Sequence, residues 1–179
     1  KIDTGTNELL CEIRERVAII TLNRPGVRNA LGDTLTPALR TMIQEMGLAK
    51  EVGAILITGS GKAFCAGGDI KSMGQRQPSA EKTTDEKVNL LKMRQRTLTG
   101  ALTKVRKPTI ASLPGPAAGA GLAIALACDI RIACESAFVS TGYARVGLSG
   151  DYGIAWLLTR LVGTGKAREL MFTASRVTA

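Results

Sequence analysis

Residues 62–70 read Lys-Ala-Phe-Cys-Ala-Gly-Gly-Asp-Ile and decide which fold this chain is expected to adopt. They follow the apolar run 52–59, which is typical of a buried strand. Small residues directly after a strand let backbone N–H groups approach a ligand closely. A second small-residue loop, 114–121, follows another apolar strand at 109–113 and opens an apolar helix. Two such loops, each with unpaired N–H donors, could together form an oxyanion hole.

These two loops, in this order, resemble the crotonase superfamily, the enoyl-CoA hydratases and isomerases. The likeness covers nearly the whole chain, from about residue 8 to residue 179, and it rests on several short motifs in succession. They are Asn23-Arg24-Pro25, Arg28-Asn29-Ala30-Leu31, Ala63–Ile70, Pro108–Ala111, Gly119–Gly121, Ala127–Arg131 and Val146–Leu148. The resemblance implies an α/β fold, a crotonase-like spiral of ββα units. It also implies that the family's C-terminal helical part is missing after residue 179.

Composition limits the possible classes of protein. With 179 residues, 45% of them hydrophobic, the chain is expected to form one domain over 1–179. No apolar run reaches membrane-spanning length, and the first residues lack a signal-peptide core. The four cysteines form no CxxC pair, which favours reduced thiols in a cytoplasmic protein. Because the chain has no histidine, triads and metal sites that need histidine are excluded.

The net charge of +9 is concentrated in one segment. Residues 82–107 hold eight Lys or Arg against Asp85 and Glu86, with apolar residues at helical spacing. One interpretation is a solvated helix face. The other is attraction to a polyanion, either the phosphates of CoA or a nucleic acid. Aromatic residues make up only 3% of the chain, which argues against base stacking, so we expect no nucleic-acid partner.

Periodicity and turn residues predict alternating strands and helices, the order of an α/β fold. Asp33 is the expected N-cap of the first long helix. The basic segment is expected to be helical up to Pro108. Predicted strands are 9–14, 17–22, 53–58, 109–113, 130–133 and 137–140, and the other predicted helices are 34–48, 121–128, 151–161 and 166–173.

The resemblance also implies a binding site. The backbone N–H groups of Ala66 and Ala120 would hold the thioester carbonyl oxygen of an acyl-CoA, where charge develops as an enolate forms. The CoA part would be lined by Ala66, Gly67, Gly68, Asp69 and Ile70. Tyr143 is a further candidate for contact with the acyl group. The simpler interpretation of Gly67-Gly68 is a tight turn with no ligand.

Acid and base residues depart from the family pattern. Typical hydratases carry two glutamates, and the corresponding positions here hold Ala123 and Tyr143 or a neighbour of Tyr143. Asp151 remains close by, and its spacing from Gly147 resembles that of a catalytic aspartate in dienoyl-CoA isomerases. The alternative role of Asp151 is a helix N-cap. Asp129 and Arg131 are expected to form a structural charge pair.

The function expected from these features is that of an enoyl-CoA hydratase or an enoyl/dienoyl-CoA isomerase. Ala66, Ala120 and Asp151 are the catalytic candidates. No cofactor or metal is expected, since coenzyme A is part of the substrate. The resemblance implies a homotrimer or a dimer of trimers. The alternative is a non-catalytic crotonase-fold protein that binds acyl-CoA or RNA.

Overall fold

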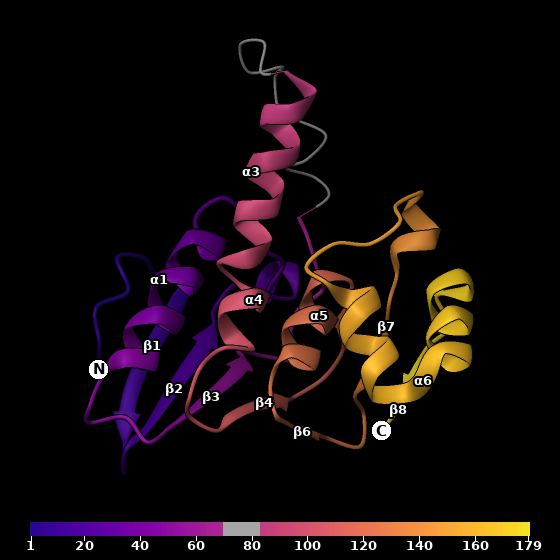
Figure 1. Cartoon of the computed structure of the whole chain (residues 1–179). Helices are drawn as coiled ribbons and strands as arrows, with labels where there is room; N and C mark the ends of the chain where they lie inside the picture. The colour runs from indigo at the N-terminus through magenta and orange to yellow at the C-terminus, as the bar shows by residue number, and fades with distance from the viewer. Residues whose placement is uncertain (70–82) are drawn as a thin grey trace.

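The computed structural model describes residues 1–69 and 83–179, and it contains two β-sheets (Figure 1). The larger sheet has the order β1-β2-β3-β4-β6, in which β1 and β2 are antiparallel and every later pair is parallel. The smaller sheet has the order β5-β7-β8. The strands are β1 (Leu9–Arg14), β2 (Val17–Leu22), β3 (Ala54–Gly59), β4 (Thr109–Leu113), β5 (Ala117–Ala118), β6 (Ile130–Ala133), β7 (Phe138–Ser140) and β8 (Val177–Thr178).

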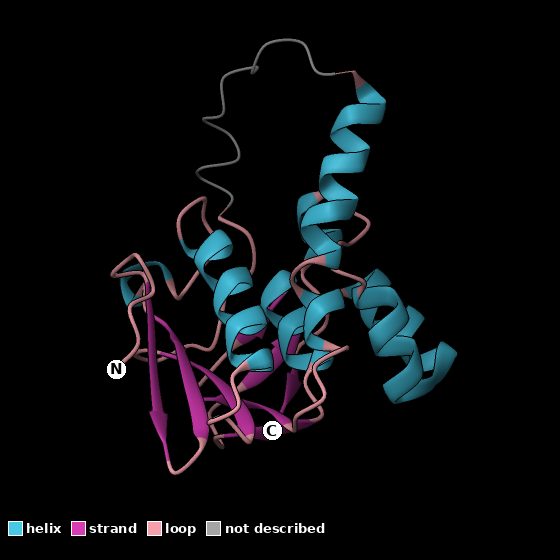
Figure 2. Ribbon diagram, turned by 60° about the vertical axis from the view of Figure 1, so that its left-hand side comes forward, coloured by secondary structure: helices cyan, strands magenta, loops and turns pink. Residues whose placement is uncertain are grey.

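Helices separate these strands, as the sequence predicts for an α/β chain. Figure 2 shows most of them stacked against one side of the larger sheet, while α3 projects away from the body. The helices are η1 (Pro25–Val27), α1 (Leu35–Leu48), α3 (Thr84–Arg96), α4 (Thr99–Leu102), α5 (Ala120–Ala127), η2 (Tyr143–Val146) and α6 (Ile154–Thr173).

Successive turns of the chain stack as a spiral of strand–strand–helix units. In the units β4-β5-α5 and β6-β7-α6, the first strand joins the larger sheet and the second joins the smaller one. Two isolated parallel bridges, Leu31 to Gly68 and Cys65 to Ala117, extend this stacking to the earlier turns. The spiral that the resemblance implied is therefore confirmed by the strand pairing.

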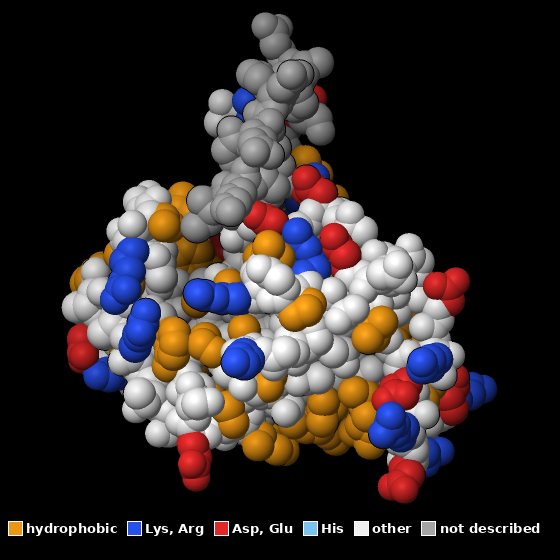
Figure 3. All heavy atoms as spheres, turned by 180° about the vertical axis from the view of Figure 1, so that it is seen from behind, with side chains coloured by type: hydrophobic (Ala, Val, Ile, Leu, Met, Phe, Trp, Pro, Cys, Tyr) orange, Lys and Arg blue, Asp and Glu red, His pale blue; other side chains and the backbone are white. Residues whose placement is uncertain are grey.

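The core lies between the larger sheet and its helices. Strands β2, β3 and β4 bury alternate residues, as a half-covered sheet requires. Helix α5 is buried along its whole length and is built almost entirely from Ala, Leu and Ile. In β6 every residue is exposed, including Ile130 and Ile132. Figure 3 shows the molecule from behind, with hydrophobic side chains gathered along the lower part of the surface in that view.

The basic segment forms two helices rather than one. Helix α3 begins with a capping box, in which Thr83 and Glu86 exchange hydrogen bonds, and it has no buried residue. Thr97 and Leu98 separate it from α4, and the side chains of Leu98 and of Leu102 in α4 are buried. The exposure of α3 is compatible with both interpretations of the basic segment, whereas α4 contributes Leu102 to the core. None of the helices in the described part of the chain is long and apolar enough to cross a bilayer.

Several local predictions were wrong. Thr34, not Asp33, is the N-cap residue of α1, and no side chain caps that helix end. The Asp129 carboxylate accepts hydrogen bonds from Thr109 instead of pairing with Arg131, whose guanidinium donates to main-chain oxygens. The predicted helix from 151 begins three residues later, at Ile154, after the cap residue Gly153.

The predicted break near Gly163 is confirmed, because that residue has φ 77° and ψ 164°.

Asn29 fastens the loop after β2 to the loop after β3. Its fully buried side chain accepts a hydrogen bond from Arg24 N at 2.8 Å. It donates to the carbonyl oxygens of Ser60 at 2.9 Å and Ala63 at 2.8 Å. Its φ of 57° is a left-handed conformation that Asn tolerates better than most residues. One side chain therefore fixes the start of the 62–70 segment.

We expect Asn29→Ala to lower the free energy of unfolding by about 2–4 kcal/mol, because it leaves one buried and two partly buried backbone groups without their partner. Denaturant unfolding measures this loss. Asn23→Ala is the matched control, since the Asn23 amide makes one exposed hydrogen bond to the Asn7 carbonyl oxygen. Equal losses from both substitutions would contradict the role given to Asn29.

Candidate active site

The two small-residue loops lie in contact, as the sequence predicts. A Cβ at Gly121 would stand 2.4 Å from the Cys65 carbonyl oxygen, and one at Gly67 would stand 2.9 Å from the Ala118 carbonyl oxygen. The Ala118 N–H donates to the Cys65 carbonyl oxygen at 2.9 Å. Gly67 also has φ 96°, which disfavours any side chain. The glycines are therefore required for this close approach, beyond any tight turn.

The two predicted oxyanion donors differ in their surroundings. Ala120 is the first residue of α5, and its N–H donates to no acceptor among residues 1–69 and 83–179. The N-terminus of a helix favours negative charge. The Ala66 N–H, in contrast, donates to the Arg28 carbonyl oxygen at 2.9 Å. A thioester oxygen would have to share the Ala66 N–H with the Arg28 carbonyl oxygen, or replace that oxygen as its acceptor. The oxyanion hole with two donors therefore stays a prediction.

The remaining residues of the first loop are held by neighbouring turns. Gly68 pairs with Leu31 in a parallel bridge, and the Asp69 N–H donates to the Leu31 carbonyl oxygen at 3.0 Å. The Asp69 carboxylate forms an ion pair with the Arg24 guanidinium at 3.1 Å. These contacts give Asp69 a structural role, and its contact with CoA stays a prediction. Ile70, also predicted at this site, lies outside the described residues.

Tyr143 and Asp151 meet beside the second loop. Tyr143 begins η2, and its hydroxyl donates to Asp151 Oδ1 at 2.5 Å. The tip of the Tyr143 ring, Cζ, lies 3.8 Å from where a Cβ at Gly119 would stand. Asp151 is half-buried, and Gly153 occupies the N-cap position of α6. The helix-cap interpretation of Asp151 is therefore wrong, and its carboxylate is held against Tyr143.

Burial dominates the electrostatics of this pair. It raises the pKa of Asp151 above its ordinary value, and the hydrogen bond from Tyr143 opposes part of that increase. The pKa of Tyr143 is raised by burial and by the nearby Asp151 charge, so the phenol keeps its proton at neutral pH. A carboxyl group with a raised pKa next to a neutral donor is suited to accept and return protons.

Sequence reasoning missed the contacts that organise this region. It identified Asp151 but not its hydrogen bond to Tyr143, because no helical or strand period relates residues eight apart across an irregular loop. It also missed Tyr152, whose main-chain oxygen accepts from Thr99 and whose side chain interacts with Arg40. Ala123 is completely buried in α5, so an apolar methyl group stands where the resemblance places a glutamate.

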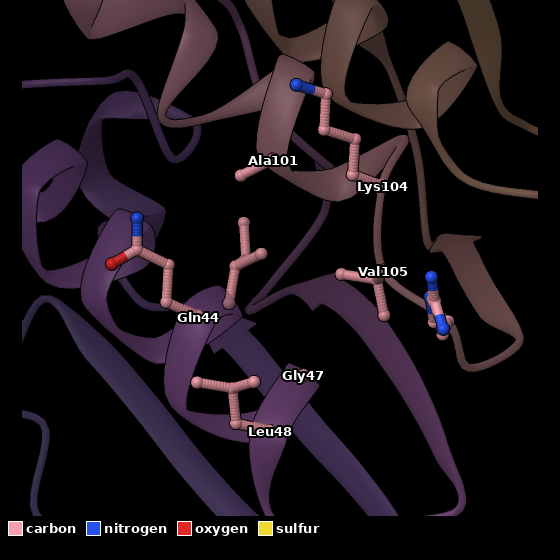
Figure 4. A pocket seen from close by; sticks show the side chains of 8 residues that line it. Gln44, Gly47, Leu48, Ala101, Lys104 and Val105 are labelled. Atoms are coloured by element: carbon pink, nitrogen blue, oxygen red, sulfur yellow. The ribbon is translucent and has the colours of Figure 1, made fainter.

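A hollow of about 370 Å³ lies away from this site, between the C-terminal half of α1 and the segment after α4 (Figure 4). It is open and mostly apolar, and its lining includes the basic residues Lys104 and Arg106. Its residues precede β3 and β4, whereas the two loops follow those strands. This hollow therefore does not belong to the site formed by the loops. Its lining residues are Ile43, Gln44, Gly47, Leu48, Ala101, Lys104, Val105 and Arg106.

With this fold and these paired loops, the chain belongs to the enoyl-CoA hydratase/isomerase family, whose sequence model matches residues 12–179. YngF of Bacillus subtilis, which carries an enoyl-CoA hydratase/isomerase name, is 39% identical over 176 residues. That match covers 98% of this chain and 65% of YngF. A short-chain-enoyl-CoA hydratase of Clostridium acetobutylicum is 34% identical, over 97% of this chain and 64% of the relative.

Solved structures agree with this assignment. The crystal structure of an enoyl-CoA hydratase from Polaromonas sp. JS666 superimposes with a TM-score of 0.85 at 31% identity. It covers 96% of this chain, which in turn covers 65% of that protein. The chain thus spans slightly less than two thirds of the length of the relatives it matches, and the crotonase fold holds for that span.

We expect Gly121→Ala to disturb the contact between the loops, because its Cβ would collide with the Cys65 backbone and thiol. In the native protein burial raises the pKa of the Cys65 thiol to about 12, and Cys11 and Cys128 are also buried. A thiol reagent should therefore label exposed Cys134 alone, and in the variant it should label Cys65 as well.

Peptide mapping after brief labelling at pH 8 identifies the modified cysteine. Gly165→Ala is the control, since a Cβ there would meet nothing within 4 Å. Unchanged protection of Cys65 in Gly121→Ala would show that the loops tolerate a wider separation than the structure indicates.

Proposed function

We propose that the protein containing this chain acts on acyl-CoA thioesters as an enoyl-CoA hydratase or isomerase, with Asp151 as the group that carries the proton. The observation behind this proposal is the half-buried Asp151 carboxylate, fixed by Tyr143 beside the N-terminus of α5. Family membership supports the same class of substrate. The names of the relatives, including a short-chain-enoyl-CoA hydratase, agree with it.

The proposed reaction needs one base and one oxyanion site. Asp151 removes a proton from a carbon of the acyl chain, and the electron pair of the broken C–H bond moves toward the thioester oxygen. The N–H of Ala120, with that of Ala66, stabilises the negative charge that develops there. Asp151, now protonated, returns the proton to a different carbon, and the double bond has moved.

Isomerisation suits this site better than hydration. Adding water across a double bond usually requires one group to activate water and another to protonate carbon. Ala123 and Tyr143, or a neighbour of Tyr143, stand where the family resemblance places the two glutamates, so Asp151 carries the proposed acid–base chemistry alone. A single carboxyl group that takes a proton and gives it back suffices for double-bond migration.

The remaining features of the proposal follow from the family. The chemistry requires no cofactor other than the coenzyme A that is part of the substrate. Ala66, Gly67, Gly68, Asp69 and Ile70 are proposed to line its binding site. A homotrimer or a dimer of trimers and a cytoplasmic location are proposed as well.

Asp151→Asn tests the proposed base directly. The amide preserves the size of the side chain but cannot accept and return a proton. We expect turnover of an enoyl-CoA to fall by on the order of 10²–10⁴, with little change in melting temperature or in CoA thioester binding. Steady-state kinetics, differential scanning calorimetry and titration of a CoA thioester measure the three quantities.

Asp85→Asn is the matched control, because Asp85 lies exposed in the first turn of α3. Full activity in Asp151→Asn would remove Asp151 from the mechanism. An inactive wild-type protein that still binds acyl-CoA would favour a non-catalytic acyl-CoA-binding protein. An inactive protein that binds RNA and no acyl-CoA would favour a non-catalytic RNA-binding protein.

The basic α3 surface is proposed to attract the CoA phosphates. Lys87, Lys92 and Arg96 are exposed on α3, whereas Lys107 donates to the carbonyl oxygens of Met46 and Ala49 and serves the fold. We expect CoA thioester affinity to fall as salt rises from about 0.05 to 0.5 M, because salt screens exposed charges. Replacing Lys87, Lys92 and Arg96 by Gln should flatten this dependence, and Lys50→Gln should not. An affinity that is independent of salt would leave α3 as a solvated surface only.

A further inference from the structure

We propose that Tyr143 is the positioning residue for Asp151: its hydroxyl holds one carboxylate oxygen and leaves the other directed to the substrate. This inference rests on the proposed function and names a second residue of the same site. The Tyr143 hydroxyl reaches Asp151 Oδ1 at 2.5 Å. No other hydrogen bond to the Asp151 carboxylate comes from the part of the chain that the structure describes.

The ring of Tyr143 is itself firmly placed. Its side chain is buried, and its tip packs against Gly119, directly before Ala120. The Leu148 N–H donates to the Tyr143 carbonyl oxygen at 3.0 Å, which closes the turn that leads to Asp151. Tyr143 thus relates the position of the carboxylate to the proposed oxyanion donor. A displacement of the Asp151 carboxylate would break its hydrogen bond to Tyr143, and a displacement of the loop before Ala120 would break the contact with the Tyr143 ring.

Tyrosine supplies this hydrogen bond without a charge. A glutamate at 143 would place a second carboxylate beside Asp151, and the two charges would repel each other. The phenol donates instead, and its hydrogen bond stabilises the charged form of Asp151 against the cost of burial. Tyr143 therefore both orients Asp151 and preserves the deprotonated form that removes a proton from the substrate.

Other ionisable groups near Asp151 come from several elements. Tyr152 is the next residue, and Arg40 of α1 and Arg94 of α3 lower the pKa of its hydroxyl, against the effect of burial. From α6, Ile154 and Met171 approach Gly150 and carry no charge. The hydrogen bond from Tyr143 is the one that opposes the effect of burial on Asp151.

Tyr143→Phe removes the hydroxyl and keeps the ring. We expect kcat to fall by about 10- to 100-fold with a small change in KM, since the lost hydrogen bond serves a charged group. Without the hydrogen bond from the Tyr143 hydroxyl, the pKa of Asp151 rises further. Asp151 must be deprotonated to act as a base, so a higher pH is then needed for activity. The acid limb of the pH–rate profile should therefore move to higher pH, so that the loss is largest at low pH. A purely structural role would lower activity equally at every pH.

Tyr152→Phe is the matched control, because the Tyr152 side chain interacts with Arg40 and the hydrogen bond to the Asp151 carboxylate comes from Tyr143. We expect it to leave the acid limb in place. A second measurement is independent of turnover: NMR titration of the Asp151 side-chain carboxyl carbon in the wild-type protein and in Tyr143→Phe.

A rise of the Asp151 pKa in Tyr143→Phe supports the proposal even when no substrate is turned over. An unchanged pKa together with an unchanged acid limb overturns it, while loss of activity in Asp151→Asn would still support the proposed function. A wild-type protein without activity overturns the proposed function, and the NMR titration then decides the Tyr143–Asp151 interaction alone.

Discussion

The close approach of the backbone after β3 to the backbone after β4 is the constraint on which the rest of this structure depends. Two glycines permit it, because a side chain at Gly121 would occupy the same space as Cys65 and one at Gly67 would press on Ala118. The approach lets Cys65 pair with Ala117, which continues the smaller sheet through consecutive turns of the spiral. It also places the N-terminus of α5 at the edge where the first loop ends. The same geometry therefore organises both the fold and the site.

The Asp151 environment balances two opposing effects. Partial burial makes the charged carboxylate costly, which favours a protonated group, and the Tyr143 hydrogen bond makes the charged form less costly. A carboxyl group that can exist in both forms is useful to an enzyme that takes a proton in one step and returns it in the next. Where the family resemblance places two glutamates, this chain has Ala123 and Tyr143 or a neighbour of Tyr143, so Asp151 supplies the carboxyl group of the proposed site.

The α/β class, most strand positions and the pairing of the two small-residue loops could be predicted from the sequence. Glycine or proline bounds the apolar runs of β3 and β4, and the charged turn at Glu15 and Arg16 separates β1 from β2. The position of Asp151 next to Tyr143 could not, because it depends on the left-handed backbone at Gly147, Gly150 and Gly153, which sets the path of an irregular loop. The acceptor of the Ala66 N–H, the Arg28 carbonyl oxygen, was equally hidden, since main-chain partners in loops leave no side-chain signature.

Hydrogen bonds fix both ends of the loop that carries Tyr143 and Asp151. Their partners lie in the end of α6 and the residue after it, and in α4. Thr141 donates to the Leu170 carbonyl oxygen at 2.7 Å, and Ser140 donates to that of Ala174 at 2.9 Å. Thr99 of α4 holds the Tyr152 carbonyl oxygen at 2.9 Å. A chain that has left the ribosome only as far as residue 153 would contain both side chains but lack the helix that secures them. We expect the larger sheet to form before this loop does, since the contacts of the loop need the second half of α6 and the residue after it.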